Sequence, residues 1–246
     1  MRRWTHQDRT HKIQREFKGQ VPLESGEWRY QSLSNMKGKF VTFEGSEGSG
    51  KSTQSAFLAE YLKVRGYDVL YIREPGGTPI SEHIRSILLD QHNAAMGGFC
   101  ELLLYMAARA QTVEEVILPA LRAGRIVICD RFLDSTLAYQ GYGLGIDLKA
   151  IKYIGRLATK GVKPDLTIFL DLAVRKGLRH RRVDRDRIEN RPLSYHQRVR
   201  LGYLKLAKRQ PGRIKVVELD DDLEKTQSRI RELIEQYVLS AYKRPG

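Results

Sequence analysis

The sequence lacks any long hydrophobic run and has only two cysteines. No apolar stretch approaches the roughly 18 to 20 residues that a membrane-spanning helix needs, and the charged first residues lack the apolar core of a secretory signal. Cys100 and Cys129 both lie within apolar stretches, which fits a reduced cytoplasm better than a disulfide framework. We therefore expect both cysteines in the core, a cytoplasmic location and no membrane partner.

Acidic residues are scarce relative to basic ones: 43 Lys and Arg against 29 Asp and Glu give a net charge of +14. Most of the excess lies in residues 173–213, where 14 basic residues accompany only three acidic ones, a local excess of +11. A DNA-binding face and a phosphate-handling lid would both show such an excess. The composition admits both, so the motifs have to decide between them.

Internal repeats and low-complexity tracts are absent, and from about residue 38 the chain alternates short apolar runs with helical patterns. Such alternation predicts parallel strands joined by right-handed crossovers, and hence a doubly wound sheet. Near-continuous apolar runs such as residues 40–43 suit strands covered on both faces. The expected strands are residues 39–44, 68–73, 125–130, 165–171 and 214–219, and the expected helices are 52–65, 99–123, 148–159 and 223–239. The prediction is an α/β fold with a five-stranded parallel sheet and helices on both faces.

Residues 1–37 stand outside this pattern, because they are polar and show neither alternation nor a sustained helical period. Met36 would be a natural chain start directly before the first strand. We expect residues 1–37 to be a flexible extension, the alternatives being a wrongly chosen upstream start codon and a functional arm. Residues 38–246 are predicted to form the working domain.

A glycine-rich motif carries the strongest chemical signal. Residues 45–52 match G-x-x-x-x-G-K-S/T in full, between a predicted strand and a predicted helix. In such a loop, backbone N–H groups curl around phosphate oxygens at the positive end of the helix. Lys51 can then reach the β- and γ-phosphates, and the Ser52 hydroxyl can bind Mg²⁺. The motif predicts a P-loop NTPase fold that binds ATP with Mg²⁺. The expected ATP-binding residues are Gly45, Ser46, Glu47, Gly48, Ser49, Gly50, Lys51, Ser52 and Thr53.

Further polar signals follow the second and third predicted strands, where open α/β sheets place their ligands. Residues 73–78 follow the second strand, and Asp130-Arg131 ends the third. Asp130 is placed to bind Mg²⁺ or its water, and Arg131 can fork onto a phosphate. Taken alone, a strand-end Asp-Arg pair is more often a structural ion pair, so that alternative stays open. The Asn-Lys-x-Asp signature with which GTPases read their base does not occur.

Taken together and in order, these motifs resemble bacterial thymidylate kinases. The motifs are residues 43–53, residues 73–78, Asp130-Arg131, Ser135-Thr136 and residues 138–141. The likeness runs from about residue 39 to the C-terminus and leaves out the N-terminal extension. It implies a nucleoside monophosphate kinase that transfers the γ-phosphate of ATP to dTMP, giving dTDP for dTTP synthesis. It also implies a small lid and a homodimer, with no stable nucleic-acid partner.

The resemblance further implies roles for individual residues. Arg73 and Arg131 would grip the phosphate of dTMP, and Glu47 would face the sugar 3′-hydroxyl and the magnesium environment. Tyr105 would stack on thymine, and Arg109, on the same face of a helix, would donate to its O4. A core aromatic and a surface charge are the plainer alternatives for these two. The family usually has Phe at the position of Tyr105, so its hydroxyl needs a partner. The expected dTMP-binding residues are Glu47, Arg73, Glu74, Arg85, Tyr105, Arg109, Arg131, Ser135, Thr136, Tyr139 and Gln140.

Arginines crowd the expected lid, residues 176–192. The phosphate loop carries no basic residue before Lys51, so the resemblance implies the bacterial type in which the lid supplies the catalytic arginines. A positioned arginine is worth roughly 10³ to 10⁵ in the rate of phosphoryl transfer. We favour Arg182 and Arg187, a solvated helix charge being an equal alternative for either one. Lys51, Arg131 and Glu47 complete the expected catalytic set.

Two other functions stay open on the sequence alone. A related kinase acting on another nucleotide or nucleoside would share the phosphate loop. A nucleic-acid-binding P-loop protein would instead use the basic residues 173–213 as its contact surface, with a salt-dependent affinity for DNA. The strand-end motifs on the acceptor side count against that second function, because a DNA binder would not need them.

Overall fold

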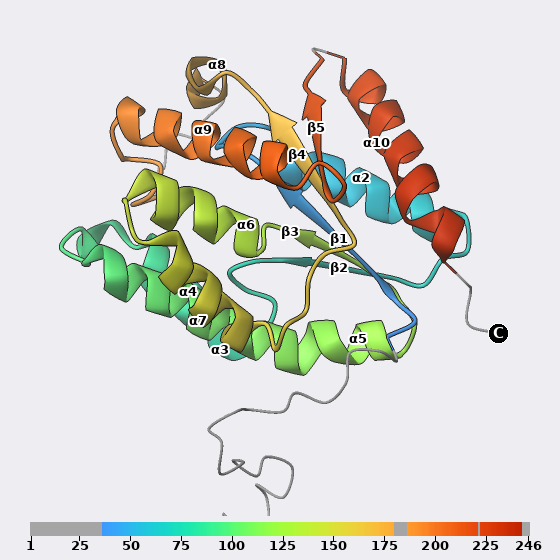
Figure 1. Ribbon diagram of the computed structural model, residues 1–246, viewed down its shortest axis with the longest axis horizontal. Helices are drawn as coiled ribbons and strands as arrows, with labels where there is room; N and C mark the ends of the chain where they lie inside the picture. Colours follow the sequence, from blue (N-terminus) through green and yellow to red (C-terminus); the bar gives the residue numbers. More distant parts are fainter. Residues whose placement is uncertain (1–35, 180–185, 221, 243–246) are drawn as a thin grey trace, which may run out of the picture. The chain divides into compact units, whose positions relative to one another are not determined.

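Five parallel strands form the centre of the computed structural model, in the order β2-β3-β1-β4-β5 (Figure 1). The structure describes residues 36–179, 186–220 and 222–242. The chain leaves the central strand β1 toward β3 and β2 on one side and toward β4 and β5 on the other, so the sheet is doubly wound. The strands are β1 Lys39–Glu44, β2 Val69–Arg73, β3 Ile126–Asp130, β4 Leu166–Asp171 and β5 Ile214–Glu218. All five predicted strands are confirmed to within one residue at either end.

Helices occupy both faces of the sheet, as predicted (Figure 1). The α-helices are α2 Lys51–Val64, α3 Pro79–Leu89, α4 Gly98–Thr112, α5 Leu118–Arg122, α6 Leu133–Thr136, α7 Leu148–Ala158, α8 Val174–Arg179, α9 Leu193–Arg209 and α10 Leu223–Tyr237. Two π-helical segments, η3 Val113–Ile117 and η4 Leu137–Gly143, continue α4 and α6. Short 3₁₀ turns are η2 Gln91–Asn93 and η5 Leu239–Ala241. The predicted helix 99–123 is therefore one helical run with a π turn in its middle.

Each face of the sheet has its own apolar core, because successive strand residues point to opposite faces. On one face, side chains such as Phe43 and Ile168 pack with Leu58 of α2 and Ile230 of α10. On the other face, Phe169 packs with residues of α4, η4, α7 and α9. Two members of this second core, Tyr139 and Ile188, also line the cavity described below.

Three helical segments that bear on the cavity were not predicted: α3, the run α6–η4, and α9. Local signals for α3 were present, since Pro79 stands at its start and Thr78 Oγ1 accepts a hydrogen bond from Ser81 N (3.2 Å). Helix α9 was not predicted, because the many basic residues of the segment 173–213 obscure the apolar spacing of residues 193–209. Its buried side is lined by Tyr195 and Tyr203, which pack against η4.

The prediction that both cysteines are buried is wrong for one of them. Cys129 lies in β3 and is fully buried, whereas Cys100 lies in the first turn of α4 and is exposed. The apolar stretch around Cys100 misled the prediction, because its neighbour Phe99 is also exposed (56%). Among the described helices, none combines the length and the apolarity of a membrane span.

Candidate active site

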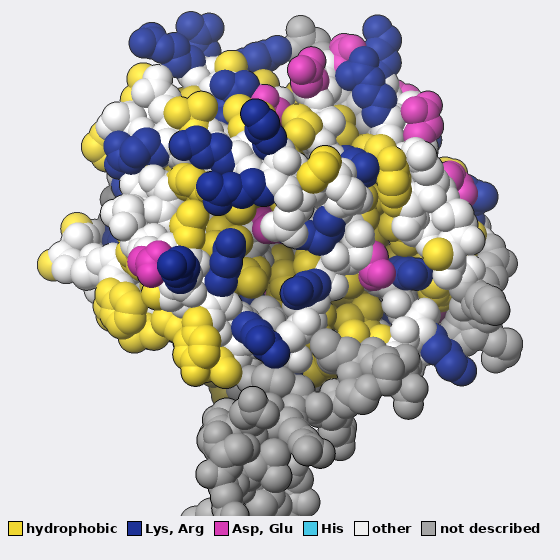
Figure 2. Space-filling model, viewed as in Figure 1, with side chains coloured by type: hydrophobic (Ala, Val, Ile, Leu, Met, Phe, Trp, Pro, Cys, Tyr) yellow, Lys and Arg dark blue, Asp and Glu magenta, His cyan; other side chains and the backbone are white. Residues whose placement is uncertain are grey.

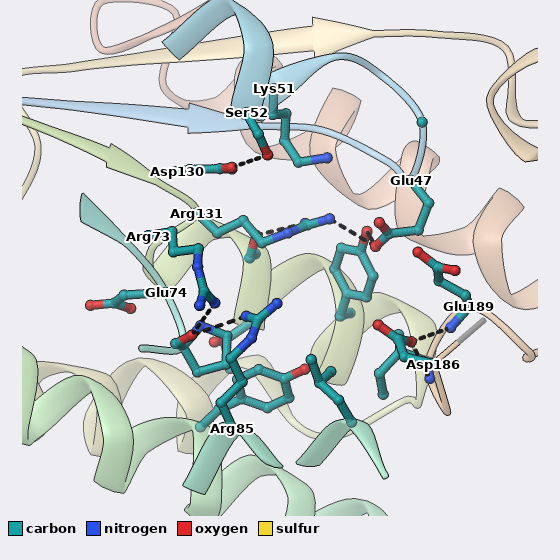
Figure 3. A pocket seen from close by; sticks show the side chains of 18 of the residues that line it. Glu47, Lys51, Ser52, Arg73, Glu74, Arg85, Asp130, Arg131, Asp186 and Glu189 are labelled. Atoms are coloured by element: carbon teal, nitrogen blue, oxygen red, sulfur yellow. Dashed lines mark hydrogen bonds and ion pairs between the residues drawn. The ribbon is translucent and has the colours of Figure 1, made fainter. Parts of the chain in front are cut away.

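A cavity of about 340 Å³ lies at the carboxyl ends of β1, β2 and β3 (Figure 3). The phosphate loop and the motifs that follow β2 and β3 meet there, because the loops after parallel strands all lie at the same edge of the sheet. The lining residues include Glu47, Gly48, Gly50, Lys51, Ser52, Thr53, Arg73, Glu74, Arg85, Tyr105, Arg109, Asp130, Arg131, Ser135, Thr136, Tyr139 and Gln140. Most of the predicted ATP- and dTMP-binding residues therefore share one cavity.

The phosphate loop joins β1 to α2 and holds Lys51 at the start of the helix. Gly50 adopts a left-handed conformation (φ 72°), which permits the tight turn into α2. Lys51 Nζ donates to Ser46 O (2.8 Å) and is nearly buried (6% exposed). Burial lowers the pKa of Lys51 to about 8. The loop is thus a compact cradle with its ammonium group turned inward.

Ser52 and Asp130 form the candidate metal position. Ser52 Oγ donates to Asp130 Oδ2 (2.5 Å), and Asp130 Oδ1 is buried without a hydrogen-bond partner among the described residues. An unsatisfied carboxylate oxygen beside a hydroxyl suits Mg²⁺, which binds through one or two protein oxygens and takes its other ligands from water and phosphate. Within the described part of the chain, no group of three or more His, Cys, Asp and Glu is placed to hold a metal. The residues present therefore fit a phosphate-bound Mg²⁺.

Arg131 and Glu47 face each other across the middle of the cavity (Figure 3). Glu47 Oε1 accepts hydrogen bonds from Arg131 Nη2 (2.7 Å) and from the Tyr139 hydroxyl (2.7 Å). Burial alone would raise the pKa of Glu47, but the Arg131 guanidinium and the Lys51 ammonium outweigh it and lower the pKa to about 2. Glu47 is therefore a carboxylate at neutral pH, and it holds the Arg131 fork in the cavity.

Glu44, which the sequence analysis did not single out, binds the backbone and side chains that follow Arg131. Its buried carboxylate accepts from Phe132 N (2.8 Å), Ser135 Oγ (2.5 Å) and the Tyr203 hydroxyl (2.9 Å). Burial raises the pKa of Glu44 to about 7. Arg131 has a positive φ of 71°, which is unfavourable for a side-chain-bearing residue. The hydrogen bond from Phe132 N helps to hold that backbone in place.

Arg109 is fixed in the cavity wall, with 2% of its surface exposed. Its Nε donates to Glu74 Oε2 (2.7 Å), one Nη to Thr136 Oγ1 (2.9 Å) and the other to Phe132 O (3.0 Å). Burial raises the pKa of Glu74, and its ion pair with Arg109 opposes that shift. Arg109 is thus no surface charge. Donation to a base O4 stays a prediction, since most of its N–H groups already have protein partners.

Arg73 and Arg85 line the cavity near Glu74 and point toward one another (Figure 3). Arg73 forms an ion pair with Glu82 of α3 (3.2 Å), and Arg85 donates to Pro75 O (3.0 Å). Two guanidinium groups that converge in this way suit an anion such as a phosphate. Tyr105 of α4 also lines the cavity, and burial raises the pKa of its hydroxyl. That hydroxyl has no hydrogen-bond partner among the described residues.

Among the residues that the structure describes, the lid side contributes carboxylates rather than arginines to the cavity. Asp186 and Glu189 line it (Figure 3), whereas Arg187 turns away and pairs with Glu101 of α4 (2.6 Å). Arg187 is 8% exposed, so the structure does not place it on a phosphate. Arg182, the other favoured lid arginine, lies outside the described residues. Gly177 of α8 lies very close to the phosphate loop. A Cβ added at Gly48 would lie 2.2 Å from the carbonyl oxygen of Gly177.

Comparisons with known proteins agree with this geometry. The sequence profile described as thymidylate kinase matches residues 43–230. The chain is 51% identical to the thymidylate kinase of Geotalea daltonii over 77% of its own length and 92% of that protein. It is 43% identical to that of a Thermoanaerobacter species over 82% and 100%. The crystal structure of the thymidylate kinase from Ehrlichia chaffeensis superimposes with a TM-score of 0.67 and 36% identity, covering 81% of this chain and 99% of that one. The chain belongs to the thymidylate kinase family.

Membership of the thymidylate kinase family confirms the resemblance and the P-loop α/β fold. The roles of individual site residues remain predictions, because the comparisons name no residues. Two buried carboxylates of the site, Glu44 and Glu101, were missed. Each is a single acidic residue within an apolar run, and such a residue draws notice only because a buried charge requires partners.

Proposed function

We propose that this chain transfers the γ-phosphate of ATP to dTMP in the cavity at the ends of β1 to β3. Members of the thymidylate kinase family phosphorylate dTMP, and the chain is accordingly a nucleotide kinase of that family. The observation that carries the proposal is one cavity that holds both the phosphate loop with Lys51 and the facing cations Arg73 and Arg131. The first suits the phosphates of ATP, and the second suits the phosphate of the acceptor. A nucleic-acid-binding role is not favoured, because it leaves the acceptor side unexplained.

On the ATP side, thymidylate kinases in general use ATP with Mg²⁺, and the residues present fit that ion. Residues 45–53 would wrap the phosphates with their backbone N–H groups. Ser52 and Asp130 would hold Mg²⁺, which when bound neutralises charge on the transferred phosphoryl group. Lys51 would move from Ser46 O onto the β- and γ-phosphates. The buried position of Lys51 strengthens this contact, because electrostatic attraction is larger away from water.

On the acceptor side, Arg131 would bridge the dTMP phosphate and the transferred group, with Arg73 and Arg85 beside it. Glu47 would keep its contact with Arg131 and reach toward the sugar 3′-hydroxyl. Tyr105 would stack on the base. Binding of the acceptor and closure of the lid would exclude water, so that ATP is not hydrolysed. Arg182 remains our proposal for the lid cation, whereas Arg187 would hold the lid side to α4 through Glu101.

We propose a homodimer formed through the exposed apolar side chains of α4 and α7. Four apolar side chains are exposed on α4 and α7: Phe99 (56%), Leu103 (45%), Tyr153 (68%) and Leu157 (40%). Figure 2 shows hydrophobic side chains gathered in this region, while Lys and Arg side chains crowd the area over α8 and α9. An apolar face of this kind is typical of a subunit contact. We further propose a cytoplasmic location, where the free thiols of Cys100 and Cys129 would stay reduced.

The decisive experiment is a coupled assay of ADP release across the common nucleoside monophosphates. We expect dTMP to be the best acceptor. One methyl group in an apolar pocket changes kcat/KM by about 10- to 200-fold, so dUMP should follow by a margin of that size, and dCMP should be weaker still. A higher kcat/KM for a purine monophosphate or for a nucleoside would contradict the proposal.

A further inference from the structure

Glu101 is a fully buried carboxylate in α4 with three charged or polar partners. Arg191 Nη2 donates to its Oε2 (2.6 Å), and Arg187 Nη2 lies 2.6 Å from the same oxygen. The other oxygen, Oε1, accepts from Gln140 Nε2 (2.8 Å). A buried charge is retained only when it is paired. Here two arginines from the lid side hold the charge, and the remaining oxygen is left for Gln140.

The contact with Glu101 determines which way the Gln140 amide faces. A carboxylate paired with two guanidinium groups has no hydrogen to donate, so it can receive only the NH₂ end of the amide. The carbonyl end, Oε1, must then face the opposite way. Gln140 is 2% exposed and lines the cavity, and its Oε1 has no hydrogen-bond partner in the described part of the chain. The amide therefore presents its Oε1 as a hydrogen-bond acceptor to the molecule that occupies this end of the cavity, the proposed base end.

Thymine matches this acceptor in a way that cytosine does not. The hydrogen-bonding edge of thymine has a single donor, N3–H, whereas N3 of cytosine is an acceptor. Two facing acceptors repel each other and leave both groups unsatisfied. We propose that Glu101 is a positioning residue that determines base specificity, by locking the Gln140 amide with its carbonyl toward the base N3. This inference rests on the proposed function, since it requires the base to lie at the Gln140 end of the cavity.

The substitution Glu101→Gln should reverse this polarity with little change in shape. The two arginines require an acceptor, so the new amide would turn its carbonyl to Arg187 and Arg191 and its NH₂ group to Gln140. Gln140 would then flip, offering its carbonyl to residue 101 and its NH₂ group to the base. That donor repels thymine N3–H and suits cytosine N3. We expect the ratio of kcat/KM for dTMP to that for dCMP to fall by about tenfold or more.

The test is a double-mutant cycle of Glu101→Gln and Gln140→Met, with kcat/KM measured for dTMP and dCMP in all four proteins. If Glu101 acts through Gln140, Glu101→Gln should lower the ratio in the wild-type background and change it less than twofold in the Gln140→Met background. A merely structural role would reduce both substrates alike in both backgrounds. Arg191→Met is the matched control, because Arg187 still pairs with Glu101; its ratio should stay within about twofold of the wild type.

Gln140→Met alone tests the amide orientation should Glu101→Gln fail to fold. Loss of a carbonyl that accepts from N3–H lowers the dTMP-to-dCMP ratio, whereas an unchanged or raised ratio overturns the inference. The two proposals fail in different ways. A wild-type enzyme that does not phosphorylate dTMP removes the proposed function and this inference with it. An active wild type whose ratio is the same in all four proteins removes only the inference.

Discussion

The phosphate end and the base end of the cavity are assembled in different ways. At the phosphate end, Lys51, Asp130 and Arg131 lie in or directly after strands and tight loops, so the sheet itself positions them. At the base end, Tyr105 and Gln140 come from helices, and the setting of Gln140 depends on contacts with the lid side through Glu101. Changes to Lys51, Asp130 and Arg131 should therefore act on catalysis with little effect on folding. Changes at the base end should act on specificity and stability together.

Lys51→Ala should produce the largest effect. Among the described residues, the Lys51 ammonium donates hydrogen bonds to Ser46 and Ser49 of its own loop, so its loss removes charge from the phosphates without opening the core. We expect kcat to fall by about 10²-fold or more, with the melting temperature nearly unchanged. Lys63→Ala, an exposed lysine on the same helix, is the control and should leave both values alone. Turnover within tenfold of wild type would show that the phosphate end does not work as proposed.

Arg131→Lys tests whether the fork of the guanidinium matters, as opposed to its charge. Lysine keeps the charge but cannot contact Glu47 and a phosphate in two-pronged fashion. We expect KM for dTMP to rise by about tenfold, with a smaller change in KM for ATP. Arg125→Lys, at a more exposed ion pair with Asp68, is the matched control. Equal changes in both KM values would contradict an acceptor-side role for Arg131.

Substitutions of the two lid arginines, Arg182 and Arg187, should distinguish a catalytic role from a structural one. Arg187 is buried against Glu101, so Arg187→Met should lower the melting temperature by several degrees, at about 2 to 4 °C per kcal/mol for a chain of this size, and lower kcat less. Arg182→Met should do the reverse if Arg182 stabilises the transferred phosphate. Thermal denaturation and kcat of both variants decide the matter. A large loss of kcat with unchanged stability in Arg187→Met would return the catalytic role to Arg187.

Glu44 makes the phosphate end sensitive to pH. Its pKa is about 7 in the folded protein, against about 4.5 for an exposed glutamate. Between these values the folded state holds a proton that the unfolded chain has released, so raising the pH through this window lowers the free energy of unfolding. Relative to Glu44→Gln, the wild type should lose about 1 to 3 kcal/mol from pH 4.5 to 7. If the free energy of unfolding changed equally with pH in the two proteins across that range, the shifted pKa would be contradicted.

A chain beginning at Met36 should show the smallest effect. Every predicted site residue follows Glu44, and the family match begins at residue 43. We expect kcat, KM and melting temperature to stay within experimental scatter of the full-length values. A clear loss of activity would indicate that residues 1–35 contribute to the site.

Much of the phosphate end could be predicted because its signals are contiguous in the chain. The strand 39–44, the loop 45–52 and the helix after it are neighbours in sequence, and alternation plus glycine spacing predicts all three. Asp130 follows the same rule, since it ends a strand beside β1. The sequence by itself therefore determined the fold class, the positions of the strands and the edge at which we propose that phosphates bind.

Only the tertiary structure decided which side chains meet at the base end. Gln140 and Glu101 are 39 residues apart, and Arg191 is 90 residues from Glu101. No local pattern shows that these groups meet, or that Arg187 turns from the cavity to a buried carboxylate. Charged side chains in a helical segment look alike in sequence whether they face water, a phosphate or an internal partner. Packing separates them, because a charge removed from water must find its counter-charge within hydrogen-bonding distance.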